Sequence, residues 1–293
     1  MEDETEEGKE GYREQWKLIK ISWWNGGGKL IQRVTVNPVL KEFLNEKPDI
    51  FAYGESLILR STKELKLDGY KTIVHRAQIK GMRRGIVIYF KEKFANIITK
   101  EHTSNKYDII WLRMKNSQDE CIFAFFYAPG ANHDEKKREE FYDELRKGID
   151  RYKENKIYLL GDSNARLGEY SGDRDIKGKF QSNKNKALFI GLVEYTGLKY
   201  LNRIYEKGKP TYEIWGKKKL IIDVALTNNI KQIKNFKVMP QILGANAQTA
   251  HKIIKITLRA KVAPTNSERK KIQRFRHCSW EALIRVRGEV ARK

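Results

Sequence analysis

Short apolar runs, each closed by a polar residue, glycine or proline, are the feature of this sequence that most limits its fold. They are rich in β-branched and aromatic residues, and none reaches the ~20 residues that a membrane-spanning helix needs. Phe141, Leu145 and Ile149 recur at four-residue spacing and predict a helix over 134–152. Further helices are expected over 185–195 and after Asn37-Pro38. The expected strands are 17–22, 49–53, 85–90, 107–114, 121–127, 157–160, 220–226 and 251–258. This pattern predicts a sheet-rich α/β or α+β domain.

The charge of the chain is strongly basic and unevenly distributed. The 293 residues carry 59 Lys+Arg against 37 Asp+Glu, a formal net charge of +22. The first ten residues carry −5 and residues 260–293 carry +7, so residues 11–259 alone carry +20. A basic body favours a polyanionic partner, most simply nucleic acid. Compositional bias of the genome toward Lys, Ile, Asn and Tyr is the alternative explanation.

Three segments follow from these patterns. We expect an acidic N-terminal tail over 1–16, a catalytic domain over 17–259 and a basic C-terminal tail over 260–293. The acidic start has no apolar segment and is not a secretory signal, so we expect an intracellular protein of the nucleus or cytoplasm, with no membrane partner. Two cysteines, Cys121 and Cys278, make neither a disulfide framework nor a zinc cage by themselves. We expect a monomer.

The sharpest local signal is Gly161-Asp162-Ser163-Asn164-Ala165, which follows the buried strand at 157–160. A strand end fixes a side chain in place while the following loop gives access to it. Asp162 can orient a water molecule or bind a metal ion, and Asn164 can donate to a phosphate oxygen. An ordinary Asx turn would explain the same two residues.

Polar residues stand at the ends of other expected strands as well. Asn25 and Glu55 follow the first two strands, and Tyr127 ends the strand at 121–127. Asp223 lies inside the apolar run LIIDVAL, where an unpaired carboxylate would cost several kcal/mol. His251 opens the last strand. Each residue has a structural alternative, but together they indicate metal-assisted phosphate chemistry.

The order of these motifs resembles the endonuclease/exonuclease/phosphatase superfamily, which is DNase I-like. The motifs are Trp-Asn-Gly at 24–26, Glu55, Tyr-x-Pro at 127–129, GDSNA at 161–165, Thr-Tyr at 211–212, Ile-Asp at 222–223 and His251. Their layout is similar to the endonuclease domains of non-LTR retrotransposons. The resemblance implies a four-layer sandwich, two mixed β-sheets face to face flanked by helices. It also implies a DNA-nicking endonuclease of mobile-element origin.

The resemblance assigns a role to each residue. Glu55 would ligate Mg²⁺, with Mn²⁺ as a substitute, and Asn25 would support that metal site. Asp162 would orient or deprotonate the attacking water, and Asn164 would position the scissile phosphate. Tyr127 would lie near the phosphate or the leaving group. His251 would contact the phosphate, and Asp223 would hold His251.

One position departs from the family pattern. The family usually has Ser-Asp-His near its end, whereas this chain has Thr249-Ala250-His251. Ala250 removes an expected metal-binding carboxylate and should weaken Mg²⁺ binding. Two alternatives therefore stay open beside a DNA endonuclease. One is a phosphomonoesterase of the same fold, and the other is a catalytically weakened relative that binds nucleic acid without cutting it.

Overall fold

The computed structural model describes residues 16–27, 47–56, 67–77, 85–117, 119–214, 217–240 and 250–261. Residues 1–15 and 262–293, which form nearly all of the two tails expected from the sequence, lie outside these ranges. The helix expected after Asn37-Pro38 lies outside them too. The segmentation of the chain into tails and domain therefore stays a prediction. None of the helices within these ranges is long and apolar enough to cross a membrane.

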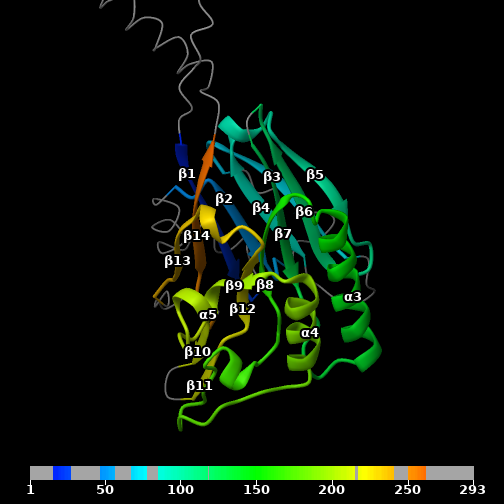
Figure 1. Ribbon diagram of the computed structural model, residues 1–293, viewed down its shortest axis with the longest axis vertical. Coiled ribbons are helices and arrows are strands. Elements are labelled where there is room, and N and C mark those ends of the chain that lie inside the picture. The colour runs from blue at the N-terminus through cyan, green and yellow to red at the C-terminus, as the bar shows by residue number, and fades with distance from the viewer. Residues whose placement is uncertain are drawn as a thin grey trace, which may run out of the picture.

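The first sheet has six strands in the order β13-β14-β1-β2-β4-β3. Neighbouring strands are antiparallel except β1 and β2, which run parallel with Asn25 beside Gly54. The strands are β1 (Trp16–Asn25), β2 (Ile50–Gly54), β3 (Tyr70–His75), β4 (Ile86–Lys91), β13 (Ile233–Val238) and β14 (Ile254–Lys261) (Figure 1).

The second sheet also has six strands, in the order β5-β6-β7-β8-β12-β9. Its one parallel pair is β7 and β8, which α3 (Glu135–Arg151) connects. A separate two-stranded hairpin joins β10 (Tyr212–Ile214) to β11 (Lys218–Leu220). The strands of the second sheet are β5 (Ile98–Thr103), β6 (Asp108–Lys115), β7 (Glu120–Tyr127), β8 (Lys156–Asp162), β9 (Lys199–Tyr200) and β12 (Asp223–Thr227).

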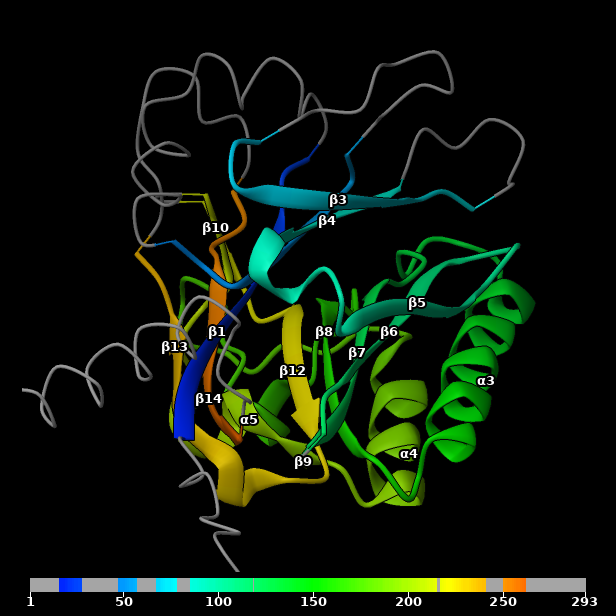
Figure 2. The same ribbon diagram turned by 90° about the horizontal axis from the view of Figure 1, so that it is seen from above.

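The two sheets pack face to face around the main apolar core (Figure 2). Ile21, Ile88 and Ile256 of the first sheet meet Phe125 and Leu160 of the second in this core. The outer face of the second sheet is covered by α3 and α4 (Lys186–Thr196), which bury a second apolar cluster. Smaller elements complete the fold: α5 (Leu201–Tyr205) and the 3₁₀ turns η1 (Glu92–Phe94), η2 (Gly168–Tyr170) and η3 (Ile230–Gln232). The predicted α/β sandwich of two mixed sheets is confirmed.

Within the described ranges, the strands that the sequence did not predict lie mostly at sheet edges. β3 and β13 close the first sheet, and β5 and β9 close the second. Sequences such as ITKEHT and IKNFKV mix charged and apolar residues, because an edge strand is protected from further pairing by its charges. The apolar patterns that predict central strands are therefore weak at these positions.

The strand predicted over 220–226 is interrupted, which corrects the sequence prediction. β11 ends at Leu220 and β12 begins at Asp223. The amides of Ile222 and Asp223 both donate to Thr211 Oγ1, each at 3.0 Å, and Ile222 O accepts from Ser163 N at 2.8 Å. These bonds to loop residues replace a ladder, so the chain changes direction just before the acid.

Candidate active site

The carboxyl ends of β7 and β8 and the start of β12 bring three predicted residues to one end of the sandwich. In the second sheet Tyr127 of β7 pairs with Asp162 of β8, and Asp162 pairs with Asp223 of β12. Residues paired across neighbouring strands point to the same face of a sheet. Tyr127, Asp162 and Asp223 therefore form a row, and all three are buried.

The first sheet meets this row from the opposite side. Asn25 Nδ2 donates to Asp162 Oδ2 at 2.9 Å, and Trp23 Nε1 donates to Asp223 Oδ1 at 3.0 Å. Both donors lie at the end of β1 and are almost completely buried. Glu55 follows β2 directly, in the left-handed region at φ +49°, and is half-buried. A left-handed backbone at a non-glycine residue is uncommon and is often found at functional sites.

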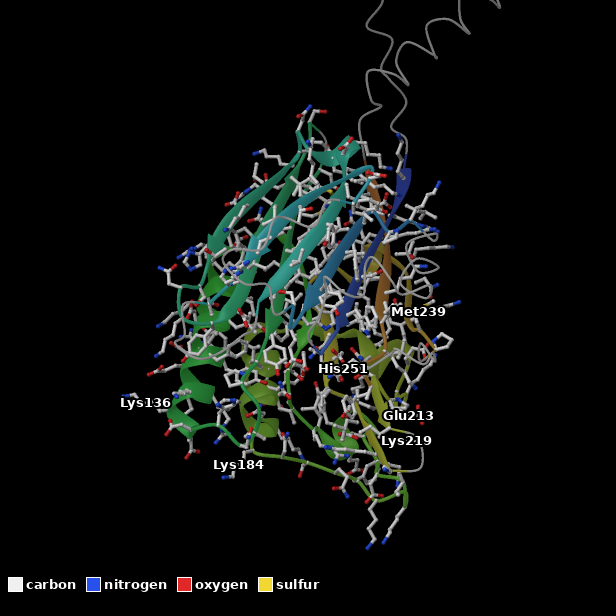
Figure 3. All side chains as sticks on the ribbon, turned by 180° about the vertical axis from the view of Figure 1, so that it is seen from behind. Lys136, Lys184, Glu213, Lys219, Met239 and His251 are labelled. Atoms are coloured by element: carbon white, nitrogen blue, oxygen red, sulfur yellow. The ribbon has the colours of Figure 1, made fainter. Side chains whose placement is uncertain are left out.

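His251 completes the group by pairing with Asp223. His251 Nδ1 lies 2.8 Å from Asp223 Oδ2, and its Nε2 lies 3.9 Å from Asp162 Oδ2. The ring of Tyr212 packs edge-on against the imidazole, with centroids 4.8 Å apart, and Trp24 Nε1 donates to His251 O at 3.1 Å. Figure 3 shows His251 at the end of the sandwich, near the β10–β11 hairpin. The predicted His–Asp pair is therefore present in the geometry.

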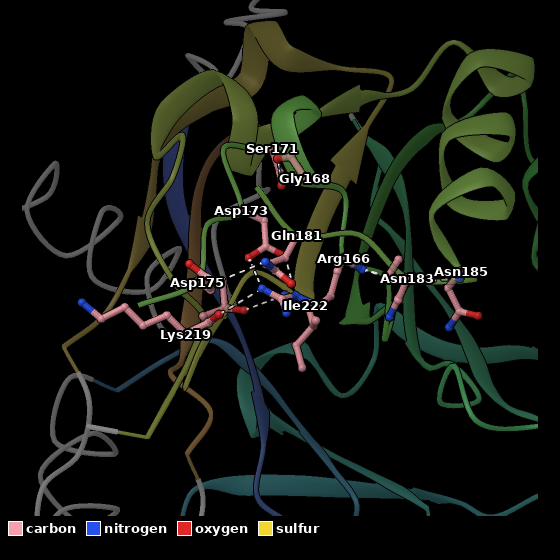
Figure 4. A network of polar contacts seen from close by, with 12 residues as sticks. Arg166, Gly168, Ser171, Asp173, Asp175, Gln181, Asn183, Asn185, Lys219 and Ile222 are labelled. Atoms are coloured by element: carbon pink, nitrogen blue, oxygen red, sulfur yellow. Dashed lines mark hydrogen bonds and ion pairs between the residues drawn. The ribbon is translucent and has the colours of Figure 1, made fainter. Parts of the chain in front are cut away.

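Asn164 is held beside this group by its own loop. Its backbone is left-handed at φ +48°, its amide donates to Asp162 Oδ1 at 2.8 Å, and its Nδ2 donates to Ala128 O at 2.8 Å. Asn183 Nδ2 donates to Asn164 O at 2.8 Å, and Asn185 Nδ2 donates to the same carbonyl at 3.1 Å. Figure 4 shows Asn183 and Asn185 beside each other. Both Asn164 and Asp162 are thus fixed before any ligand binds.

The pKa values of Asp162 and His251 are both raised, but by different causes. Burial, followed by the negative charge of Asp223, raises the pKa of Asp162 well above its ordinary value, although His251 and the donors from Asn164 and Asn25 oppose this. Burial alone would lower the pKa of His251. The charge and hydrogen bond of Asp223, with the charges of Asp162 and Glu55, overcome it and raise the pKa to about 9. A cationic His251 next to carboxylates is suited to contact an anionic phosphate.

The donor set suits a hard divalent cation. Ligand atoms of Asp162, Asp223 and His251 lie within 4.8 Å of one another. Both oxygens of Asp223 are already used, however, one by Trp23 and one by His251. Both oxygens of Asp162 also accept hydrogen bonds, from Asn25 Nδ2 and Asn164 N, so a metal ion would use their second lone pairs. Glu55 and Asn25 would add further oxygens, which are the ligands that Mg²⁺ prefers.

Ala250 leaves its position without a carboxylate, as the sequence indicated. Its carbonyl accepts from Glu213 N at 2.8 Å, which pairs this segment with β10. The Glu213 carboxylate lies nearby, but Lys252 Nζ is 2.6 Å from one of its oxygens and Lys219 Nζ is 3.4 Å from the other. Glu213 is thus already neutralised by two lysines and does not replace the missing acid.

Three residues that hold Asp223 in place were not assigned a role from the sequence. Trp23 binds its side chain, Thr211 accepts from its amide, and Asn202 Nδ2 donates to its carbonyl at 3.0 Å. Thr211 belongs to the Thr-Tyr motif at 211–212, and in the structure its hydroxyl oxygen accepts from the amides of Ile222 and Asp223. Trp23 and Asn202 gave no local signal, because both reach Asp223 only through the packing of the fold.

Among the comparisons with known proteins, only the comparison of structures gives matches, and these support the fold. The sequence matches no family model and no curated protein. Solved structures do match. The endonuclease domain of TRAS1, a telomere-specific non-LTR retrotransposon, is 14% identical with a TM-score of 0.62, covering 83% of this chain and 100% of that one. An AP endonuclease from Archaeoglobus fulgidus is 15% identical with a TM-score of 0.61, covering 82% and 99%. The 3′ phosphatase NExo from Neisseria, bound to a product DNA hairpin, is 16% identical with a TM-score of 0.60, covering 82% and 99%. The chain therefore has the DNase I-like fold that its motifs predicted.

Proposed function

We propose that this protein is a metal-dependent phosphodiesterase, an endonuclease that nicks DNA and descends from a mobile element. The observation that carries the proposal is the buried group formed where the ends of both sheets meet. There Asp162 lies 2.9 Å from Asn25 Nδ2 and within 4 Å of a His251–Asp223 pair, with Asn164 bonded to it. Phosphodiester hydrolysis needs an activated water and positive groups on the phosphate oxygens, and this group offers both.

Each residue has a separate task in this proposal. Asp162, whose pKa is raised, accepts a proton from the attacking water. His251, held cationic by Asp223, contacts a phosphate oxygen, and Asn164 donates to another. Tyr127 stands next to Asp162 on the neighbouring strand, near the leaving group. A divalent ion held by Glu55, Asn25 and Asp162 would supply charge stabilisation at the phosphate.

The choice of DNA as substrate rests on charge and on the structural neighbours. The body of the chain carries +20, which is more than a small phosphate ester requires. The TRAS1 domain belongs to a retrotransposon, the Archaeoglobus protein is an AP endonuclease, and NExo was solved with a DNA hairpin. A long phosphate polymer fits both observations.

A plasmid-nicking assay tests the proposal. Wild type should convert supercoiled plasmid to the open-circle form with Mg²⁺ and not with EDTA. Asp162→Asn and His251→Ala should each reduce nicking by at least about 10²-fold, the scale of losing one charged group at a transition state. Asp143→Asn and His102→Ala are matched controls, because Asp143 of α3 is partly exposed, His102 of β5 is exposed, and neither belongs to the group around Asp162. Equal nicking by Asp162→Asn and wild type would refute the proposal.

Two further measurements, made beside the nicking assay, separate the two alternatives. A phosphomonoesterase would release phosphate from a 3′-phosphorylated oligonucleotide faster than it nicks plasmid. A binding protein weakened at Ala250 would retain salt-sensitive DNA affinity but show no nicking with Mg²⁺ or Mn²⁺. Either result would replace the endonuclease proposal.

A further inference from the structure

A small, rigid hairpin extends from the loop that follows Asn164. It comprises residues 173–181, and we call it the 173–181 hairpin. Arg174 and Phe180 form an antiparallel bridge, and Gln181 N donates to Asp173 O at 3.0 Å. The turn closes when Gly178 N donates to Asp175 O at 3.0 Å. Figure 4 shows its base beside Arg166 and Lys219.

The Asp175 carboxylate makes this hairpin stiff. Its Oδ1 accepts from the amides of Lys177 and Lys179, both at 2.9 Å, and its Oδ2 accepts from Gln181 Nε2 at 3.0 Å. Three donors on one carboxylate fix the turn internally. The conformation of the tip therefore does not depend on a ligand, which lowers the entropy lost on binding.

The base of the hairpin is tied to the candidate active site. Arg166 forms two hydrogen bonds of 3.1 Å with the buried Asp173 carboxylate, and its Nη2 also donates to Lys219 O at 3.3 Å. Arg166 N donates to Asn183 Oδ1 at 3.0 Å, and Asn183 holds the carbonyl of Asn164. The hairpin thus has a fixed position relative to the residue proposed to bind the scissile phosphate.

The tip exposes large apolar side chains between cations. Ile176 is 50% exposed and Phe180 is 43% exposed, and both belong to this hydrogen-bonded hairpin. The guanidinium of Arg174 stacks over the Phe180 ring at 3.7 Å. Lys177 and Lys179 alternate with these residues and are exposed. Exposure of the two apolar side chains to water is unfavourable. The combination of apolar and basic side chains is complementary to DNA, which has apolar bases beneath its phosphates.

A cavity beside the hairpin is lined by both cations and acids. Its volume is about 540 Å³, and it lies between the hairpin, residues 207–210 and β11. Arg174, Lys207 and Lys219 line it together with three acids, Glu169, Asp173 and Asp175. Of these acids, Asp173 is paired with Arg166, and the Asp175 oxygens accept hydrogen bonds within the turn.

We propose that the 173–181 hairpin is a wedge that enters a groove of duplex DNA beside the nicking site. Ile176 and Phe180 contact bases or sugars there, and Lys177, Lys179 and Arg174 bind the flanking phosphates. The inference rests on the proposed function, because it assigns the partner of that site. The bonds from Arg166 to Asn183 set the distance between the groove contact and the scissile phosphate.

Fluorescence anisotropy with a labelled 30-base-pair duplex tests the wedge, with plasmid nicking measured in parallel. Ile176→Ser/Phe180→Ser should weaken duplex binding about tenfold or more, the effect of burying even one large apolar side chain at an interface. Lys177→Gln/Lys179→Gln should reduce the slope of log affinity against log salt by about 2, since each phosphate contact contributes about 0.9. Hydrolysis of bis(4-nitrophenyl) phosphate should stay unchanged in both variants, because the substrate is too small to reach the hairpin.

Leu18→Ser/Tyr195→Ser is the matched control, because these residues are 56% and 63% exposed on β1 and α4. Circular dichroism melts of every variant check folding. Duplex affinity of the Ile176→Ser/Phe180→Ser variant within twofold of this control would overturn the wedge. Equal weakening on a single strand of the same length would overturn the assignment to duplex. Absence of nicking by wild type, with weakened duplex binding by the hairpin variant, would refute the proposed function but leave the wedge supported.

Discussion

Replacing Asp223 by asparagine should switch His251 from a cation to a neutral ring. The asparagine keeps the shape of the side chain but offers one acceptor oxygen where the carboxylate offered two. Trp23 Nε1 and His251 Nδ1 both point at this group, at 3.0 and 2.8 Å. One of them must then face an NH₂ group, and the imidazole avoids the conflict by losing its Nδ1 proton.

The size of the effect follows from the pKa of His251. A rise from 6.5 to about 9 corresponds to roughly 3 kcal/mol of net stabilisation of the charged ring, although burial acts against it. Asp223 is the main source of that stabilisation. Without its charge, burial dominates, and the pKa of His251 should fall from about 9 to below its ordinary value of 6.5. At pH 7.5 the ring would change from mostly charged to mostly neutral.

Nitrogen-15 NMR of the imidazole rings measures this change directly. The chain has five histidines, so the spectrum is simple, and His251→Gln identifies the signal of interest. The titration is done in EDTA to keep metal ions away from Asp162. Nicking of plasmid by Asp223→Asn at pH 7.5 should fall about 10²- to 10³-fold, as expected when a charged phosphate contact is lost.

Two results would refute the reasoning. In the first, His251 of the wild-type protein titrates at or below 6.5, so that Asp223 does not hold it cationic. In the second, Asp223→Asn leaves the pKa of His251 unchanged, so that another group supplies the charge. Asp143→Asn serves as a control for a carboxylate change on the surface and should not move the titration.

Two further predictions concern stability and metal binding. In EDTA, the free energy of unfolding should fall as pH rises from about 6.5 to 9, because folded His251 keeps a proton that the unfolded chain releases, and the raised pKa of Asp162 acts in the same direction from about pH 4 upward. Urea unfolding at pH 6, 7.5 and 9 measures this, and a profile that His251→Gln leaves equally steep above pH 6.5 would contradict it. Ala250→Asp should lower the Mg²⁺ concentration needed for half-maximal nicking by restoring a carboxylate beside the site. An unchanged metal titration would show that the new acid pairs with Lys252, which now binds Glu213, or that the site does not lack a ligand.

Local pattern was sufficient for the central strands and the two long helices. β6, β7 and β8 are apolar on both faces, because one face packs on the first sheet and the other on α3 and α4. β4 is also apolar on both faces, because Val87 and Tyr89 on its outer face are buried in a smaller apolar cluster. α3 was predicted by its four-residue apolar spacing. The structure adds its N-cap, Asp134, whose side chain accepts from Lys137 N. Edge strands such as β5 and β13 were missed because their charged residues obscure the alternation.

The candidate site was predicted as a set of residues but not as an arrangement. Asp162, Asn164, Asp223 and His251 were chosen because each carries polar chemistry at or near a strand end, and the structure brings them together. Their catalytic roles stay predictions until the nicking assays are done. Trp23 could not have been chosen, because an apolar aromatic residue inside a strand is usually a core residue, and its indole N–H matters only opposite Asp223.

The sequence by itself determined which residues could do chemistry, in what order they occur, and which strands are buried. The tertiary structure alone decided which of these residues contact one another. The Asn25 side chain donates a hydrogen bond to Asp162, which lies 137 residues further along the chain. The Trp23 side chain donates one to Asp223, which lies 200 residues further along. Alternation along a strand tells which face of a sheet a side chain occupies, but not which sheet lies opposite that face. The same limit applies to the 173–181 hairpin. Its apolar tip is visible in the sequence, but its rigid link through Arg166 and Asn183 to Asn164 exists only in the folded chain.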